Sequence, residues 1–235
     1  MKHIQKGGPP HDYAAWCSRV KGTNEEDYRR LQNPAKANLH LSLLKEQGWL
    51  CAYTMKRIDE ASSHIEHIKP ESLCRSDKLG SDLDYKNMTA CYPRVGMSGQ
   101  CRYGAQAKGQ WWNQDGTMFV SPLHPNCEKR FRFYLDGRIE AVGGGQAALN
   151  TIDVLKLDHA TLTDERRRVI HEFVYGPSGA DPLSTAKVKL AIQNIYTPNH
   201  GKFYEFCKAI HDALAEHLKD LERIAKRRKF SRKKK

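Results

Sequence analysis

The last third of the chain carries the clearest helical pattern of apolar and polar positions. Apolar residues recur at helical spacing from Phe203 to Ile224, which predicts one long amphipathic helix. A shorter helix is predicted with Thr163 as its cap and an end at Gly176-Pro177, and another begins at Asp181-Pro182. The chain beyond about residue 160 is therefore expected to be helical.

A β-hairpin gives the strongest local signal before that region. Residues 131–135 and 138–142 are apolar-rich and flank Asp136-Gly137. Because Gly accepts the positive φ that a tight turn needs, this pair predicts a two-residue hairpin turn. Gly143-Gly144-Gly145 then marks a break before the helical part.

The first half of the chain alternates short apolar runs with polar loops. A helix is predicted from Asn33-Pro34 to Gly48, because Asn caps helices, Pro suits the first helical position and Gly ends them. Extended segments are expected at residues 49–53, 64–68 and 87–91. Between residues 92 and 114 no period is sustained, so an irregular insertion with one short helix is expected.

The first 20 residues, with Gly7-Gly8-Pro9-Pro10, indicate an arm that becomes ordered only by docking. Trp16 is its expected anchor. A short helix is predicted after Asn24.

Composition bounds the class of protein. At 235 residues and 39% hydrophobic, the chain can bury one sizeable core, either as one elaborated domain or as a compact domain with a helical extension. Seven cysteines, an odd count, occur without an apolar leader or a run of about 18 apolar residues, which favours a reducing cytoplasm.

The positive charge is concentrated at the C-terminus. The formal net charge is +12, and eight positive residues lie within residues 226–235, which leaves +4 for the remainder. Such a segment favours a polyanionic partner, since neutralised phosphates release counterions. The alternative is a solvated tail that keeps the protein soluble.

The side chains best suited to catalysis and metal binding are close together in one run, His64-Ile65-Glu66-His67-Ile68-Lys69-Pro70. In an extended segment side chains alternate, so His64 and Glu66 point to one side and His67 to the other. Neutral His is a suitable general base for phosphodiester cleavage, and a divalent cation held by a carboxylate stabilises charge on the phosphate. The alternative is chance, in a chain that holds 11 His.

This run resembles the first strand of an HNH, or ββα-metal, nuclease, with an acidic residue beside His and Pro three positions later. Residues 50–53, 122–131 and 136–139 resemble the HNH nuclease subunit of Septu-type antiphage systems, which also occurs beside retrons. Residues 4–7 and 164–168 also fit, so the resemblance extends from residue 1 to about 175.

The resemblance implies a role for each matching residue. Glu66 takes the metal-ligand place, His67 is the general base and His64 stands beside the metal. Asn87 matches the middle Asn, which ties the loop to the strand and orients the His. Taken alone, Asn87 would be an ordinary turn residue.

Two features depart from the family pattern. A third ligand is expected on the following helix, yet no His lies between His67 and His124. Tyr103 stands near the expected place but is a poor neutral ligand, so Asn113 is the substitute and His124 a more distant one. Relatives also often carry a Cys-x-x-Cys zinc pair where this chain has residues 51–54, so a structural zinc held by Cys51, Cys91, Cys101 and Cys127 is doubtful.

The expected fold class is therefore α+β: a ββα-metal HNH core with an added β-hairpin and a helical C-terminal part. The expected divisions are an N-terminal arm and docking segment (1–32), the nuclease core with its hairpin (33–145), a helical region (146–225) and a basic tail (226–235).

The resemblance implies a Mg²⁺- or Mn²⁺-dependent endonuclease that acts as the toxic effector of antiphage defence under a separate ATPase subunit. A retron reverse transcriptase and its multicopy single-stranded DNA are further expected partners. DNA is the first expected substrate, and RNA, including tRNA, the second. The alternative function is a catalytically impaired nucleic-acid-binding adaptor. Residues expected to contact nucleic acid are Lys69, Lys108, Arg227, Arg228, Lys229 and Arg232.

Overall fold

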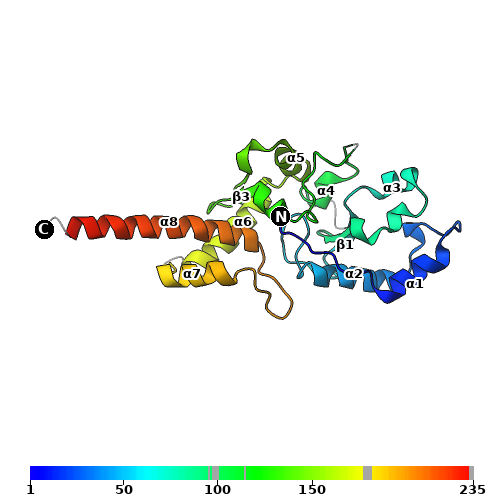
Figure 1. Cartoon of the computed structure of the whole chain (residues 1–235), viewed down its shortest axis with the longest axis horizontal. Helices are drawn as coiled ribbons and strands as arrows, with labels where there is room; N and C mark the ends of the chain where they lie inside the picture. The colour runs from blue at the N-terminus through cyan, green and yellow to red at the C-terminus, as the bar shows by residue number, and fades with distance from the viewer. Residues whose placement is uncertain (95, 97–100, 114, 177–181, 233–235) are drawn as a thin grey trace.

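The protein combines helices with two small antiparallel sheets (Figure 1). The computed structural model describes residues 1–94, 96, 101–113, 115–176 and 182–232. Its strands are β1 (His64–His67), β2 (Met88–Cys91), β3 (Phe131–Phe133) and β4 (Ile139–Ala141). Its α-helices are α1 (His11–Val20), α2 (Ala35–Glu46), α3 (Glu71–Asp77), α4 (Ala105–Lys108), α5 (Gln146–Leu155), α6 (Ala160–Tyr175), α7 (Thr185–Asn194) and α8 (Cys207–Arg232).

Short 3-10 turns connect these elements, at Tyr28–Arg30, Ser81–Leu83, Tyr85–Asn87, Cys127–Arg130 and Val142–Gly144. None of the helices in the described part of the chain is long and apolar enough to cross a membrane.

Strands β1 and β2 form one antiparallel pair, and helix α4 follows β2 along the chain. Their register places His64 opposite Cys91 and His67 opposite Met88. The next helix, α4, is a single turn. The mixture of helices and small antiparallel sheets agrees with the predicted α+β class.

The outer edge of β2 is closed by a side chain instead of a third strand. Gln47, buried just beyond α2, accepts a hydrogen bond from the Ala90 backbone N–H at 2.7 Å and donates one to the Ala90 carbonyl at 2.8 Å. The carboxamide thus satisfies both backbone groups of Ala90 as a neighbouring strand would, and it fixes α2 against the sheet.

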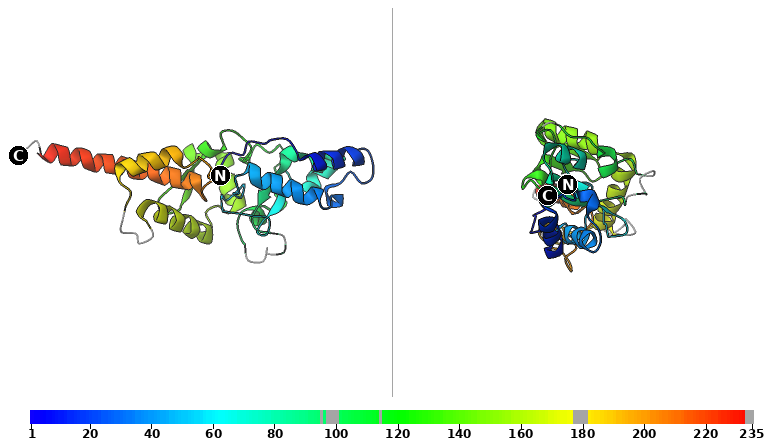
Figure 2. Two further views of the ribbon diagram at one scale, coloured as in Figure 1. Left: turned by 90° about the horizontal axis from the view of Figure 1, so that it is seen from below. Right: turned by 90° about the vertical axis from the view of Figure 1, so that its right-hand side faces the viewer.

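The molecule is elongated, with α1 and α2 at one end and α8 projecting from the other (Figures 1 and 2). The first part of α8 is buried against β3 and α6, whereas its side chains from Glu222 to Arg227 are exposed. Helix α7 lies alongside α8. The long amphipathic helix predicted from sequence is confirmed from Cys207 onward and extends past Ile224 to Arg232. Its predicted start was wrong, because Phe203 and Phe206 lie before the helix and Phe206 has positive φ.

The N-terminal arm docks on the body of the same chain. Met1 and Ile4 are buried, and the Ile4 backbone N–H donates to the Pro122 carbonyl at 2.9 Å. In α1 the anchor is Tyr13, whose hydroxyl donates to the Leu83 carbonyl at 2.7 Å. Trp16, the predicted anchor, is partly buried and packs against the core.

Residues 49–53 do not form the predicted strand. Trp49 and Met55 adopt positive φ, and the backbone N–H of Met55 returns to the Cys51 carbonyl at 2.9 Å. The segment is therefore a tight turn, and an isolated bridge between Leu50 and Arg57 is its only ladder contact in the described chain.

The predicted hairpin forms, but its turn has three residues. Tyr134 pairs with Arg138 through its backbone N–H at 3.1 Å, so residues 135–137 make the loop. Only Gly137 has positive φ, whereas a two-residue type I′ turn needs positive φ at both central positions.

Two predicted features of the helical part differ from the structure. Helix α5 begins at Gln146, before the expected helical region, and α6 begins at Ala160, so Thr163 lies inside it instead of capping it. Pro177 and Asp181, expected at the end of one helix and the start of the next, lie outside the described residues, and α7 is capped by Ser184.

A buried arginine holds α6 to the hairpin. Arg166 is 1% exposed, and its guanidinium donates to the carbonyls of Gly137 at 2.9 Å and Leu157 at 2.7 Å. Burial lowers the pKa of Arg166 to about 10, so it stays charged at neutral pH.

We predict that Gly137→Ala destabilises the protein strongly. A Cβ there would clash with the Thr163 carbonyl oxygen and would lie 2.9 Å from the Arg167 backbone nitrogen, at φ +83°. Gly143→Ala is the matched control, because Gly143 has φ +63° and an added Cβ would meet no atom within 4 Å.

The left-handed conformation alone costs about 1–2 kcal/mol at either position. Thermal unfolding should therefore show a larger loss for Gly137→Ala than for Gly143→Ala. Equal losses of stability in the two variants would mean that α6 shifts to accommodate the added methyl group without measurable cost.

Candidate active site on strand β1

Strand alternation separates the chemical groups of β1 onto two faces. Pairing with β2 fixes the strand, so His64 and Glu66 share one face and His67 points to the other. The His64 Nε2 atom lies 3.5 Å from Glu66 Oε2, whereas His67 packs against Tyr28 from the 3-10 turn near the N-terminus. The site therefore has two sides with different surroundings.

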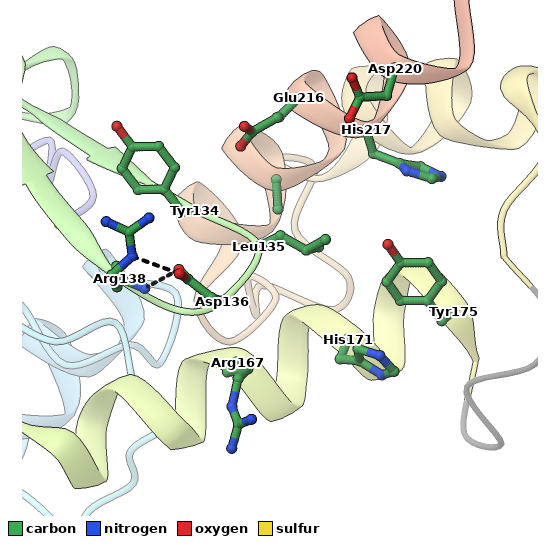
Figure 3. Close-up of a pocket in the computed structure, with 11 residues that line it drawn as sticks. Tyr134, Leu135, Asp136, Arg138, Arg167, His171, Tyr175, Glu216, His217 and Asp220 are labelled. Carbon is green, nitrogen blue, oxygen red and sulfur yellow. Dashed lines mark hydrogen bonds and ion pairs between the residues drawn. The ribbon is translucent and has the colours of Figure 1, made fainter. Parts of the chain in front are cut away.

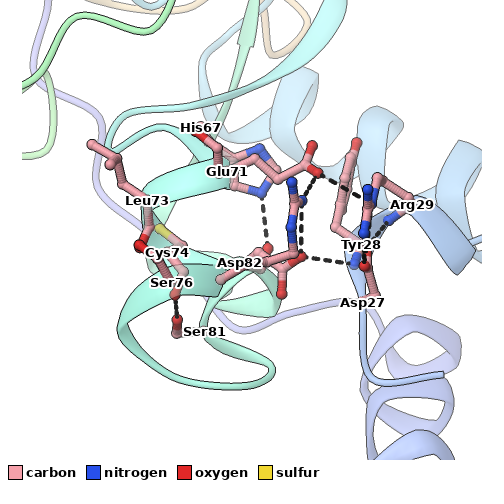
Figure 4. A network of polar contacts seen from close by, with 12 residues as sticks. Asp27, Tyr28, Arg29, His67, Glu71, Leu73, Cys74, Ser76, Ser81 and Asp82 are labelled. Atoms are coloured by element: carbon pink, nitrogen blue, oxygen red, sulfur yellow. Dashed lines mark hydrogen bonds and ion pairs between the residues drawn. The ribbon is translucent and has the colours of Figure 1, made fainter. Parts of the chain in front are cut away.

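His67 is buried and held in one orientation. Its Nε2 atom lies 2.8 Å from the Asp82 carbonyl oxygen, and the Tyr28 ring packs edge-on against it at 4.7 Å (Figure 4). Because a carbonyl oxygen only accepts hydrogen bonds, Nε2 carries the proton and Nδ1 keeps its lone pair. Burial lowers the pKa of His67, which keeps the ring neutral and able to take a proton.

Glu66 is held as an anion by a buried ammonium. Lys108 Nζ lies 3.0 Å from Glu66 Oε1 and 3.2 Å from the His67 carbonyl oxygen, and the Tyr53 hydroxyl lies 3.4 Å from the same carboxylate oxygen. Burial acts to raise the pKa of Glu66, but hydrogen bonding from His64 and the charge of Lys108 outweigh it, and the pKa is lowered.

His64 presents its second nitrogen to Glu66. The Nδ1–H donates to the Pro93 carbonyl oxygen at 2.5 Å, which leaves Nε2 facing Glu66 Oε2. Burial acts to lower the pKa of His64, but interaction with Glu66 outweighs it and the pKa is raised. The His64 Nε2 and Glu66 Oε2 atoms therefore face each other across a short gap.

The same gap suits a divalent cation. Metal-binding His residues usually donate their other ring N–H to a carbonyl or carboxylate, as His64 does to Pro93. Imidazole nitrogen and carboxylate oxygen are ligands for Mn²⁺ and later transition metals, and carboxylate suits Mg²⁺. The residues present therefore fit a metal held by His64 and Glu66, with Lys108 orienting the carboxylate from its other oxygen.

Asn87 ties the loop after β1 to the start of β2. Its side-chain oxygen accepts from the Lys69 backbone N–H at 2.8 Å, and its Nδ2 donates to the Lys69 carbonyl at 2.9 Å. These two hydrogen bonds join the start of β2 to the residue two positions after β1. The Lys69 ammonium itself pairs with Asp77.

Asn113, Tyr103 and His124, considered as further metal ligands, form hydrogen bonds away from Glu66. The Asn113 side chain is bonded to Asp115 at 2.6 Å and to the Met118 backbone N–H at 3.3 Å, within its own turn. Tyr103 bonds to Lys56 at 2.9 Å. His124 is exposed and accepts from the Asn126 backbone N–H. Within the described residues, none of the three forms a hydrogen bond or ion pair with Glu66.

Lys108 was expected to contact nucleic acid, and the structure contradicts this. Its side chain is 1% exposed and its ammonium is bonded inside the protein, so no phosphate reaches it in this conformation. A positive residue before Gly109 looked like a surface cation in the sequence, whereas α4 turns it inward.

The four cysteines considered for zinc do not gather. Cys51 and Cys91 hydrogen-bond to each other, but the thiol of Cys101 donates to the Tyr103 carbonyl and that of Cys127 to the Pro122 carbonyl. Among the described residues, the one group of three His, Cys, Asp or Glu close enough to share a metal is Asp27, Glu71 and Asp82.

A hollow of about 820 Å³ runs along β1 beside His64 and Ile65. Its lining includes Tyr28, which packs on His67, Lys36 from α2 and Arg94 after β2. Neither of these two cations forms an ion pair within the described part of the chain. The carboxylates of Glu60 and Glu71 also line the hollow, so its charge is mixed.

A second hollow, of about 440 Å³, lies between the β3–β4 turn, α6 and α8 (Figure 3). The rings of His171 and Tyr175 on α6 face His217 on α8, with the centroids of His171 and His217 at 4.7 Å and 5.8 Å from that of Tyr175. Its arginines and carboxylates offset one another, and it contains none of the β1 residues to which the resemblance assigns a role.

Sequence reasoning missed three residues that shape the site: Tyr28, Tyr53 and Asp82. Tyr28 and Asp82 contact His67, and Tyr53 contacts Glu66. A 3-10 turn within the loop after β1 carries Asp82, and the other two come from segments before the strand. No periodicity or motif in the sequence pointed to them.

No known protein-family model matches the chain. Over 162 residues, the chain is 26% identical to a protein of Vibrio cholerae serotype O1 biovar El Tor that is described as a candidate HNH endonuclease of retron Vc95. The match covers 66% of this chain and 73% of that protein. This similarity supports, in broad terms, an HNH nuclease from a retron context.

We predict that Lys108→Met lowers the free energy of unfolding by about 3–5 kcal/mol, because it leaves the Glu66 carboxylate buried without its cation. Lys156→Met is the control, since Lys156 is half-exposed in its pair with Asp153 and should cost about 0–1 kcal/mol. Chemical denaturation measures both.

Adding Glu66→Gln to Lys108→Met should recover much of the lost stability, since no unpaired charge then remains buried. Additive losses in the double variant would show that the two side chains are not coupled.

Proposed function

We propose that this chain is a metal-dependent HNH-type endonuclease that hydrolyses phosphodiester bonds. The observation that carries the proposal is the state of β1: a neutral His67 with its Nδ1 lone pair available, one residue from a carboxylate–imidazole pair suited to a divalent cation. The similarity to the Vibrio protein supports the same class of reaction.

His67 is the general base in this proposal. The Asp82 carbonyl holds the Nε2 proton, so the ring accepts the proton of the attacking water at Nδ1. Its lowered pKa keeps the ring unprotonated at neutral pH. Asn87 holds the backbone of Lys69, just after the strand, and so limits movement of the segment that carries the base.

Glu66 and His64 hold the metal. A bound Mg²⁺ or Mn²⁺ supplies Lewis-acid stabilisation of charge on the phosphate and leaving oxygens. Lys108 keeps Glu66 ionised and fixes one of its oxygens, and the Pro93 carbonyl sets the ring orientation of His64.

The substrate in this proposal is nucleic acid, with DNA first and RNA such as tRNA second. The hollow along β1, with Lys36 and Arg94 in its walls, provides a path for a backbone past His64. The basic end of α8, where the side chains of Lys226 and Arg227 are exposed, adds a second contact that is independent of base sequence.

The biological setting follows from the resemblance to Septu-type subunits and from the retron context of the relative. In this proposal the chain is the toxic effector of antiphage defence, controlled by an ATPase subunit, with a retron reverse transcriptase and its single-stranded DNA as further partners.

One observation favours the adaptor as a second candidate. Within the described residues, no third His, Cys, Asp or Glu joins His64 and Glu66. An adaptor would bind nucleic acid with little cleavage. The geometry of His67 argues for the enzyme, because an adaptor gains nothing from a neutral imidazole held in one tautomer.

The functional test is His67→Ala, in cells that co-express the genomic neighbours under phage challenge, with DNA and RNA both followed. Loss of one nucleic acid with the wild type and its preservation with His67→Ala is the expected result. His11→Ala, an exposed residue at the start of α1, should behave as wild type. Identical protection by wild type and His67→Ala would leave the adaptor.

The metal test uses binding as well as activity. Glu66→Gln should weaken Mn²⁺ binding to the full chain by at least about tenfold, since it removes a charged ligand. Glu60→Gln, an exposed residue beside the same hollow, should bind as wild type does. Chelation should abolish cleavage and added Mg²⁺ or Mn²⁺ should restore it; unchanged affinity in Glu66→Gln would place the metal elsewhere.

A further inference from the structure

We propose that Asp82 is a positioning residue: its buried carboxylate holds its own backbone carbonyl against His67 and thereby sets which ring nitrogen carries the proton. This inference rests on the proposed function of His67 as the general base. Asp82 is fully buried and belongs to a 3-10 turn of three residues, Ser81–Leu83.

The carbonyl that contacts His67 needs support from outside its own turn. A 3-10 turn of three residues has few internal hydrogen bonds, and this one follows Gly80, which has a left-handed backbone. The turn alone therefore does not fix a carbonyl to within the few tenths of an ångström that a 2.8 Å hydrogen bond to Nε2 requires.

The Asp82 carboxylate provides that support through two other segments. Its Oδ2 accepts a hydrogen bond from the Tyr28 backbone N–H at 3.0 Å and lies 3.6 Å from Arg75 Nη1 on α3 (Figure 4). The Tyr28 ring packs edge-on against His67 at 4.7 Å. One aspartate thus joins the turn, α3 and the N-terminal segment around the imidazole.

The remaining carboxylate oxygen indicates that this arrangement is not optimised for stability. Asp82 Oδ1 is buried and has no hydrogen-bond partner in the described part of the structure. A half-satisfied buried carboxylate is destabilising compared with an apolar side chain of similar size. Its presence beside His67 fits a role in setting the geometry of the base.

A metal ligand is the competing role for Asp82. Oxygens of Asp27, Glu71 and Asp82 lie within 4.8 Å of one another. However, guanidinium groups already balance these charges: Arg29 pairs with Asp27 at 2.5 Å, and Arg75 pairs with Glu71 and approaches Asp82. The geometry therefore favours a structural role for Asp82 over metal binding. We call the Asp82 carboxylate with its partners, the Tyr28 backbone N–H and Arg75, the clamp.

The clamp has a chemical consequence that can be measured. When the Asp82 carbonyl accepts from Nε2, the neutral ring keeps its lone pair on Nδ1. If the turn shifts, the ring is free to take the other tautomer, and the proton acceptor then points to the wrong side. A displacement of about 1 Å in such a group can cost on the order of a hundredfold in rate.

The experiment compares Asp82→Ala with Asp82→Asn in the full chain. Nitrogen-15 NMR of the histidine rings distinguishes a protonated ring nitrogen from one with a lone pair. We expect wild type to show His67 protonated at Nε2 alone. Asp82→Asn should keep that pattern, because its amide oxygen still accepts from the Tyr28 N–H, whereas Asp82→Ala should show both tautomers. Asp84→Ala, in the neighbouring turn, is the control and should match wild type.

Kinetics in the active complex give a second readout. Asp82→Ala should lower kcat by about a hundredfold with little change in KM, and Asp82→Asn should recover most of it. An unchanged tautomer in Asp82→Ala, or an equal defect in Asp82→Asn, would overturn the clamp. A tenfold loss of Mn²⁺ binding in Asp82→Asn would instead make Asp82 a metal ligand.

A second variant and a separate activity measurement cover the cases in which Asp82→Ala does not fold or His67 is not the base. If Asp82→Ala does not fold, Arg75→Met, which removes the guanidinium that faces the Asp82 carboxylate, serves as the second variant and should also mix the tautomers. If His67→Ala proves as active as wild type, the proposed function fails, and the tautomer measurement still decides the role of Asp82.

Discussion

The site depends on one constraint, the alternation of side chains along β1. Pairing with β2 fixes the strand, so a carboxylate and an imidazole that are neighbours in sequence must point to opposite faces. Each face then needs its own support. Lys108 and Tyr53 surround Glu66, whereas Tyr28 and the Asp82 carbonyl surround His67. Separate supports allow adjacent residues to keep opposite states, one charged and one neutral, because each state is set by different neighbours.

The sequence predicted the parts of this site that are local. Period-two alternation placed His64 and Glu66 on one face, and a second extended segment was expected at residues 87–91, which the structure pairs with β1 as β2. The residues that contact His67 and Glu66 could not be predicted from the sequence, because Tyr28 and Lys108 lie about 40 residues from the strand on either side. Burial decides what such residues do: an ammonium that ends a one-turn helix looks the same in sequence whether it faces solvent or a carboxylate.

The element predictions failed where backbone conformation, and not hydrophobic pattern, decides the structure. Residues 49–53 have the composition of a strand, yet positive φ at Trp49 and Met55 folds them into a turn. Asp136-Gly137 favours a two-residue turn, yet the fit of Gly137 against α6 accompanies a three-residue loop. In both cases contacts from distant parts of the chain compete with the local preference and win.

Helix α4 has only four residues, bracketed by Gly104 and Gly109 with positive φ. A helix this short does not persist by its own hydrogen bonds, because nucleation is unfavourable and almost no propagation follows it. Tertiary contacts therefore stabilise it: the ion pair of Lys108 with Glu66, and the hydrogen bond from the Gly104 backbone N–H to the Leu155 carbonyl. Local opening of this turn would release the ammonium from Glu66 without unfolding the sheet. Amide hydrogen exchange in α4 therefore reports how often Lys108 leaves the carboxylate, separately from opening of the rest of the core.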